Sequence, residues 1–139
     1  MRFFSPFRLA TYLLVLFCFG HTAGGMLAQK SLGPGADTVF EAMKSVHFTF
    51  NGSDSTWYGF WFGFGITISA YIVFSAVVAW QLDQVPRERW RDVSVIAWAL
   101  AATQFASALL SFEYFFLGPA LLGLAVTALL TVGTLRKRA

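Results

Sequence analysis

The sequence has few charged residues and one cysteine, and each shortage excludes a class of protein. Only 12% of the 139 residues are charged, whereas 57% are hydrophobic and 18% are aromatic. This leaves too little polar surface to cover a soluble domain, so the composition indicates an integral membrane protein. The single cysteine, Cys18, excludes an intramolecular disulfide, a Cys-x-x-Cys redox pair and a cysteine metal cluster.

Familiar catalytic motifs are also missing. The chain contains no His-Glu-x-x-His, no glycine-rich phosphate loop and no serine elbow. Its apolar runs hold no carboxylate or basic side chain that could form the coupling-ion site of a small drug exporter. The net charge is +3, but the basic residues stand beside apolar runs, as topology signals do. We therefore expect no nucleic-acid partner. The sequence identifies no catalytic residue and no cluster of metal ligands, which favours a non-catalytic protein without deciding the question.

Long apolar runs predict an all-α fold, an antiparallel four-helix transmembrane bundle in one domain over residues 1–139. The first run has about 21 residues and would extend about 31 Å as a helix, which matches the hydrocarbon thickness of a bilayer. It also resembles a secretory signal, but it is longer than the usual apolar region and no Ala-x-Ala site follows. The predicted spans are residues 9–29, 56–82, 93–112 and 118–135.

A polar segment over residues 30–55 separates the first two spans. Thr38 and Glu41 have capping-box spacing, and apolar residues recur at helical spacing from Val39 to Phe50. This pattern predicts a short amphipathic helix that lies on the membrane surface or over the mouth of the bundle. The sequence Asn51-Gly52-Ser53 that follows is a glycosylation sequon or a turn before the second span.

The distribution of basic residues predicts the orientation. Eight of the ten would lie on one side of the membrane and two on the other, which places both termini in the cytoplasm. The eight are Arg2, Arg8, Arg87, Arg89, Arg91, Arg136, Lys137 and Arg138, and the two are Lys30 and Lys44.

Polar residues inside the spans fall at similar depths. His21, Gln104, Gly123 and Thr67 each lie roughly 16 to 21 Å from the cytoplasmic ends of their helices, near the bilayer midplane. His21 is the one side chain inside a span that could change charge near neutral pH. His21, Gln104 and Thr67, with His47 from the outer segment, are therefore candidate ligand-binding residues, although His21 could equally be a structural imidazole bonded to Gln104 or Thr67.

Small residues mark the expected contacts between helices. A stripe down the third span consists of Ser94, Ala97, Ala101, Gln104, Ala108 and Ser111. Elsewhere the predicted packing positions are Gly20, Gly24, Gly59, Gly63, Gly123 and Thr127. Trp57, Tyr58 and Trp61 open the second span and have the character of an interfacial aromatic belt.

Three stretches resemble an uncharacterised family of short four-span bacterial membrane proteins. They are His21-Thr22-Ala23-Gly24-Gly25, then Phe48 with Asn51-Gly52-Ser53, and then residues 56–65, TWYGFWFGFG. The resemblance implies a bacterial protein of the inner membrane with four helices, and it implies no activity. A looser likeness to the DoxX-like four-helix proteins rests on size and number of spans.

Two functions from different classes follow. The first is a non-catalytic accessory or packing subunit of a larger membrane complex, with membrane lipids and other membrane proteins as partners. This function is suggested because Phe and Trp are abundant and no set of catalytic residues is present. The second is a redox or ligand-handling protein in which His21 contacts a quinone, lipid, metal or haem. The cofactor, if any, is unknown, and a second axial histidine for haem could only be His47.

Overall fold

The computed structural model describes residues 4–28 and 30–138 and confirms the all-α class. Four helices are long and apolar enough to cross a membrane, as a multi-pass membrane protein requires. Two positions used in the predictions, Arg2 and Gln29, lie outside the described residues. The chain groups into two compact units, which we call the core unit (residues 4–18 and 72–138) and the hairpin unit (residues 19–28 and 30–71).

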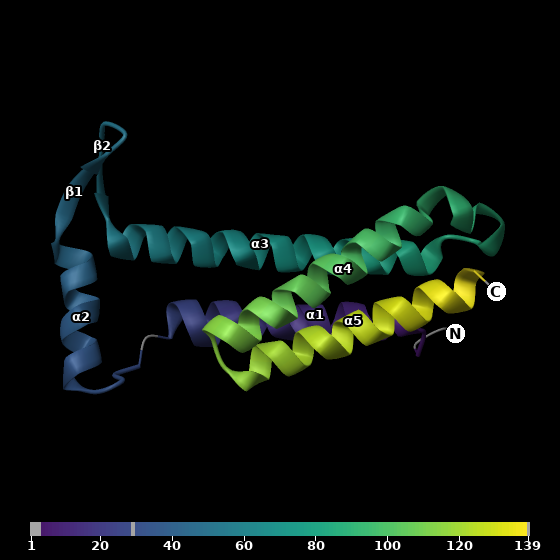
Figure 1. Ribbon diagram of the computed structural model, residues 1–139, viewed down its shortest axis with the longest axis horizontal. Helices are drawn as coiled ribbons and strands as arrows, with labels where there is room; N and C mark the ends of the chain where they lie inside the picture. Colours follow the sequence, from purple (N-terminus) through teal and green to yellow (C-terminus); the bar gives the residue numbers. More distant parts are fainter. Residues whose placement is uncertain (1–3, 29, 139) are drawn as a thin grey trace. The chain divides into compact units, whose positions relative to one another are not determined.

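The first span begins earlier than predicted. Helix α1 covers Pro6–Phe19, and a π-helix, η1, continues it over Gly20–Leu27 (Figure 1). The helix can start at Pro6 because proline is well accommodated in a first turn, where its missing N–H leaves no bond unmade. Ser5 Oγ accepts a hydrogen bond of 3.1 Å from the Arg8 N–H and so satisfies one of the free donors at this end.

The other three spans also extend past their apolar runs. Helix α3 covers Trp57–Gln84, a 3₁₀ turn, η2, covers Arg87–Arg89, α4 covers Trp90–Tyr114 and α5 covers Leu117–Arg138. Backbone hydrogen bonding continues into the charged ends, so hydropathy alone placed the ends a few residues short. Pro86 stands just after α3, and Pro119 lies in the first turn of α5, both as predicted.

The core unit is packed around small side chains. Helices α4 and α5 run side by side (Figure 1), and four of the six stripe positions on α4 are buried. Small residues allow this close approach, which supplies the attraction between helices in lipid. The buried stripe residues are Ala97, Ala101, Gln104 and Ala108.

Helix α2, over Pro34–Ser45, begins before the predicted capping box. Thr38 lies inside the helix, where its Oγ1 donates to the Pro34 carbonyl at 2.8 Å, so the capping-box prediction is wrong. Asp37 instead organises this end of the helix, because its carboxylate accepts bonds from Ser31 Oγ at 2.6 Å and from the Leu32 N–H at 3.2 Å. Gly33 precedes the helix with a φ of 107°, a conformation that favours glycine.

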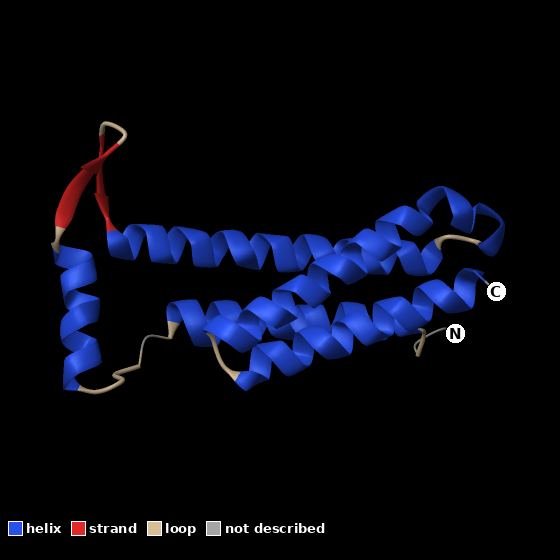
Figure 2. Ribbon diagram, in the orientation of Figure 1, coloured by secondary structure: helices blue, strands red, loops and turns tan. Residues whose placement is uncertain are grey.

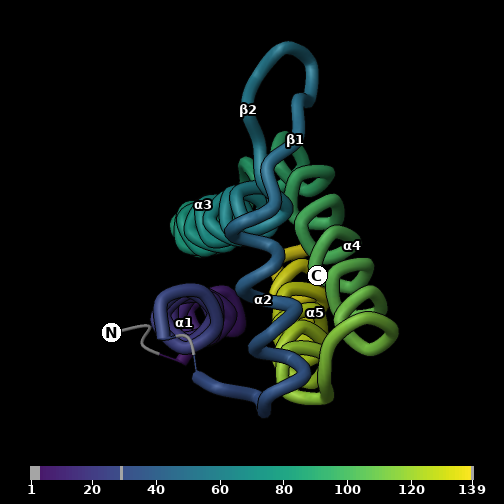
Figure 3. The backbone as a smooth tube through the Cα atoms, turned by 90° about the vertical axis from the view of Figure 1, so that its left-hand side faces the viewer, coloured from purple at the N-terminus to yellow at the C-terminus, as the bar shows by residue number. Residues whose placement is uncertain are grey.

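A β-hairpin follows α2, where the apolar spacing predicted continued helix. Strands β1 (His47–Phe50) and β2 (Ser53–Thr56) pair antiparallel, with Phe50 opposite Ser53 (Figures 2 and 3). The two turn residues between the strands, Asn51 and Gly52, have φ values of 49° and 82°. Positive φ at both positions defines a type I′ turn, and Asn-Gly is its preferred sequence.

Candidate functional site

A buried ion pair joins two helix ends in the core unit. Arg8 Nε donates to Asp83 Oδ2 at 2.7 Å, and Ser5 Oγ donates to the other carboxylate oxygen, Oδ1. Asp83 is only 4% exposed and Arg8 is 22% exposed. The Arg8 guanidinium carbon also lies 3.5 Å from the centre of the Trp80 ring. The first turn of α1 is thereby fixed to the last turn of α3.

Lys137 joins the end of α5 to the same place. Its Nζ donates three hydrogen bonds, each of 2.7 Å, to the carbonyls of Leu82, Asp83 and Val85. The last carbonyls of a helix lack partners within the helix, and a cation is favoured there by the helix dipole. Lys137 therefore acts as a cap for α3 that is supplied by another helix.

Two aromatic rings complete this junction. Phe7 and Trp90 are 1% and 2% exposed, their ring centres lie 5.6 Å apart, and Lys137 Nζ lies 5.2 Å from the Trp90 ring. The indole Nε1 of Trp90 is buried and has no hydrogen-bond partner among the described residues. A buried donor without a partner costs about 1–3 kcal/mol, so packing must hold this ring in place. We call Ser5, Arg8, Asp83, Trp90 and Lys137 the helix-end junction.

Sequence reasoning missed the helix-end junction. In the sequence, Arg8 and Lys137 are no more than orientation signals, and Asp83 directly follows the predicted second span, which ends at residue 82. One signal was present, because a carboxylate directly after an apolar run, as Asp83 is after Leu82, needs a partner when the helix continues past it. Nothing in the sequence indicates that Arg8 is that partner.

Gln104 makes a polar contact within the core unit. Its Nε2 donates to Ser75 Oγ at 3.2 Å, and both residues are buried. This bond joins α4 to α3 at a depth where an unbonded amide would be costly. Its role as a ligand-binding residue stays a prediction.

His21 and its neighbours lie in the hairpin unit. His21 Nε2 lies 3.0 Å from the Gly65 carbonyl oxygen, and since a carbonyl only accepts, Nε2 carries the proton. One position further, Thr22 Oγ1 and Ser69 Oγ lie 2.8 Å apart. Two adjacent polar residues of η1 thus bond to α3, and π-helical turns occur often at functional sites.

The other predicted partners of His21 bond elsewhere. Thr67 Oγ1 donates to the Gly63 carbonyl of its own helix at 2.8 Å, and its side chain is exposed. His47 Nδ1 donates across the hairpin to Asp54 Oδ2 at 2.7 Å. Within the hairpin unit, His21 thus bonds to a backbone carbonyl and Thr67 bonds within its own helix.

The predicted packing positions differ in how closely other residues approach them. A Cβ atom at Gly123 would lie 2.9 Å from the Ala108 Cβ, so α5 and α4 approach closely there. At Gly59 a Cβ would lie 3.3 Å from Thr56 Oγ1 of the same chain segment. Thr127 bonds to the Gly123 carbonyl at 2.8 Å. A Cβ placed at Gly20, Gly24 or Gly63 would meet no described atom within 4 Å apart from the neighbouring backbone of its own helix.

The hairpin unit carries two clusters of aromatic rings. In the first, the Phe40 ring of α2 makes edge-to-face contacts with the belt residues Tyr58 and Trp61, at 5.6 and 5.3 Å between centres. The second, which we call the hairpin ring cluster, joins the strands to the start of α3. It consists of Phe48, Phe50, Trp57, Phe60 and Phe64, with successive ring centres 5.1 to 6.3 Å apart.

Hollows on the hairpin unit are open and shallow. One, of about 320 Å³, lies between the hairpin and α3 and is lined by His47, Asp54 and Phe60 among others. Another, of about 290 Å³, lies beside α2 and includes Lys30 and Lys44. Within the described ranges, no three His, Cys, Asp or Glu side chains are grouped closely enough to hold a metal ion.

No family model, curated protein or solved structure matches the chain.

Proposed function

We propose that the protein is a non-catalytic accessory subunit of a larger membrane complex, and that the hairpin unit is the part that contacts its partner. The observation that carries this proposal is the hairpin ring cluster. Phe50, Trp57 and Phe64 in it are 51%, 60% and 67% exposed. A lone two-stranded hairpin is marginally stable, so one that presents large rings gains stability when a partner covers them.

The expected partner is another membrane protein with an apolar, ring-accepting surface near the membrane interface. Aromatic side chains are enriched at the centres of protein interfaces because they bury a large area with few rotatable bonds. The belt residues Trp57, Tyr58 and Trp61 would hold the hairpin unit at the depth where such a surface is available. Lipid headgroups are the competing occupant.

A photoreactive amino acid placed at Phe50 tests the proposal in native membranes. We expect a discrete protein adduct on a denaturing gel and a complex larger than the monomer on a native gel in mild detergent. The matched control is the same substitution at Phe112, which is 72% exposed on α4 outside the hairpin unit. A monomer that forms only lipid adducts from both positions would overturn the proposal.

The accompanying topology is an antiparallel bundle in the bacterial inner membrane with both termini in the cytoplasm. The helix-end junction supports it, because Arg8, Asp83 and Lys137 bring the start of α1 and the ends of α3 and α5 together. The four spans also agree with the number of helices that the resemblance to short four-span bacterial membrane proteins implies. A reporter enzyme fused after α5 should be active only in the cytoplasm; activity only outside the cell would reverse the topology.

Ligand handling through His21 is the second function. Its specific support is the paired His21–Gly65 and Thr22–Ser69 contacts in a π-helical turn. The optical spectrum and metal content of the purified protein test it, with His21→Ala as the comparison. A colourless, metal-free protein that is unchanged by this substitution would exclude the metal and haem versions.

A further inference from the structure

The core unit uses its basic residues in two different ways. Arg8 and Lys137 are directed into the helix-end junction, where one bonds to a carboxylate and the other to three carbonyls. Five other arginines near the same helix ends are exposed. These five, which we call the arginine cluster, are Arg87, Arg89, Arg91, Arg136 and Arg138.

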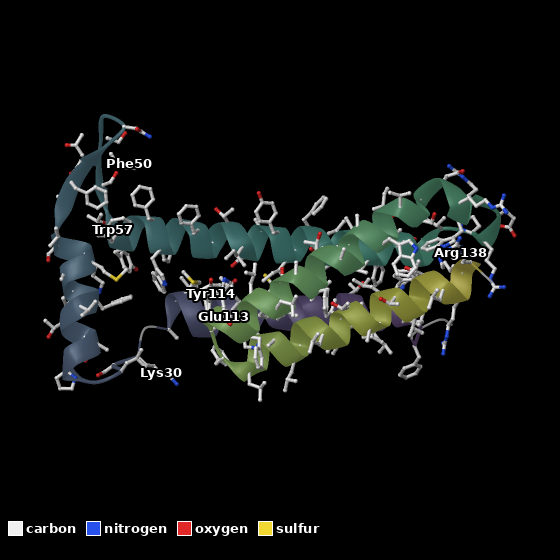
Figure 4. The ribbon with its side chains drawn as sticks, viewed as in Figure 1. Lys30, Phe50, Trp57, Glu113, Tyr114 and Arg138 are labelled. Carbon is white, nitrogen blue, oxygen red and sulfur yellow. The ribbon has the colours of Figure 1, made fainter. Side chains whose placement is uncertain are left out.

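The fold brings the arginine cluster together from two distant parts of the chain. Arg87 Nη2 donates to the Arg136 carbonyl at 3.2 Å, which joins turn η2 to the last turn of α5. The bond from Lys137 to the carbonyl of Val85, two residues before η2, joins the same turn of α5 to the start of this connection. Figure 4 shows nitrogen atoms gathered around the labelled Arg138. The five exposed arginines therefore lie at one end of the core unit, near the bond between η2 and the last turn of α5.

The arginine cluster keeps a positive charge after its acidic neighbours are counted. Asp83 is buried and paired with Arg8, which leaves Glu88 and Asp92 as the exposed carboxylates of this segment. Five arginines and two carboxylates give 5 − 2 = +3. Like charges gathered at one end of the core unit repel one another, so a bound anion would relieve the repulsion.

Apolar side chains begin immediately beside the arginine cluster. Val95 and Ile96 are exposed one turn after Arg91, and Val132 and Leu135 are exposed just before Arg136. On a helix that crosses a membrane, such side chains face acyl chains, so the arginines stand at the level of the headgroups. A ligand that fits both surfaces has a negative head attached to an apolar tail.

We propose that the arginine cluster binds the headgroups of anionic phospholipids. Guanidinium groups recognise phosphate through paired hydrogen bonds, and clusters of four to eight basic residues beside a membrane helix attract anionic lipid. Basic residues determine the orientation of a membrane protein while it is inserted. The Arg87–Arg136 bond keeps these arginines in place after the protein has folded, so they can have a second role. This inference goes beyond the proposed accessory role and is independent of the hairpin ring cluster.

Native mass spectrometry of the full chain in a neutral detergent tests the proposal. Phosphatidylglycerol and phosphatidylcholine with identical acyl chains are titrated separately, and the bound fractions are compared. We expect a clear preference for phosphatidylglycerol that decreases in high salt. Equal binding of the two lipids by the wild-type protein would overturn the proposal, whatever the variants do.

Variants then locate the site. Arg89→Gln with Arg138→Gln should weaken phosphatidylglycerol binding by about fivefold for each arginine removed. Lys30→Gln with Lys44→Gln removes the same charge from the hairpin unit and should leave the preference intact. If both pairs lose binding equally, the effect is net charge and the arginine cluster is not a site. Arg89→Lys with Arg138→Lys, which keeps the charge, checks that any loss is not caused by unfolding.

Competition identifies the source of the phosphate group. Inorganic phosphate and glycerol 3-phosphate carry the anionic group without a tail, so neither should displace the lipid at equal concentration. Displacement by either one would show that the arginine cluster takes a free phosphate, and it would overturn the lipid assignment.

Discussion

Arg8 Nε lies 2.7 Å from the Asp83 carboxylate, although the two residues are 75 positions apart in the chain. Each lies within a turn or so of the end of its helix, Arg8 near the start of α1 and Asp83 near the end of α3. A carboxylate that is nearly excluded from solvent needs this partner, because desolvation of an unpaired charge costs several kcal/mol, on the order of 3–5. The pair therefore sets the register of the two helices.

Removal of one member of this pair should destabilise the protein strongly. We expect Asp83→Asn to lower the free energy of unfolding by about 3 kcal/mol, since it leaves the Arg8 guanidinium without its counter-charge. Thermal unfolding in a neutral detergent, followed by circular dichroism, measures the change. Glu88→Gln, an exposed carboxylate five positions away, is the control and should unfold as the wild type does. Equal effects of both substitutions would contradict a specific ion pair.

Replacement of Lys137 should loosen the end of α3. In Lys137→Met the three carbonyls lose their common donor, and we expect the free energy of unfolding to fall by about 2–3 kcal/mol. Hydrogen exchange at the end of α3 should increase in the same variant. Lys137→Arg should recover only part of the loss, because a planar guanidinium cannot direct its donors to three converging carbonyls.

The control for Lys137 is its exposed neighbour, Arg138→Met. Both substitutions remove one positive charge from the last turn of α5, but Lys137 is the one that bonds to the three carbonyls at the end of α3. In neutral detergent, where no anionic lipid is present, Arg138→Met should leave stability unchanged. A matching loss in both variants would assign the effect to helix-dipole electrostatics instead.

Close contact between α4 and α5 can be tested at one position. Gly123→Ala places a Cβ 2.9 Å from Ala108 Cβ and 3.3 Å from its Cα, so the helices must shift. We expect a loss of about 1–3 kcal/mol in the free energy of unfolding, the usual cost of overpacking. Ala108→Gly in the same chain should restore most of it, because it removes the opposing methyl group.

Gly63→Ala is the matched control for Gly123. Both glycines lie inside long helices, but a Cβ at Gly63 meets no described atom within 4 Å other than the backbone of its own helix. Alanine is the better helix former, so this substitution should be neutral or stabilising by up to about 1 kcal/mol. A loss at Gly63 as large as that at Gly123 would contradict the assignment of the Gly123 loss to the contact with Ala108.

The four spans could be predicted from the sequence because a bilayer demands about 20 apolar residues in succession, and no other feature of a short chain imitates this. The buried stripe of α4 was predictable for a related reason, since small residues at three- and four-residue steps define one helix face. The pairing of Arg8 with Asp83 was not, because a long-range contact leaves no local pattern.

The hairpin was missed for a different reason. Val46, His47 and Phe50 fit the helical spacing of α2, while Phe48 and Phe50 also fit the alternation of a strand. Short apolar segments satisfy both periods, so the turn decides between them. Asn51-Gly52 was read as a turn before the second span, yet it is the strongest local signal for a two-residue hairpin.

A substitution at Gly52 should open the hairpin and leave the helices intact. Valine strongly disfavours the φ of 82° found there, so in Gly52→Val we expect the turn to lose about 1–3 kcal/mol and the amides of residues 47–56 to exchange faster. Exchange in α4 and α5 should be unchanged. Gly35→Ala, at a helical glycine of α2, is the control, and in it the strand amides should exchange as slowly as in the wild type. Unchanged protection of the strands in Gly52→Val would mean that the ring contacts of Phe48 and Phe50, and not the turn, maintain their pairing.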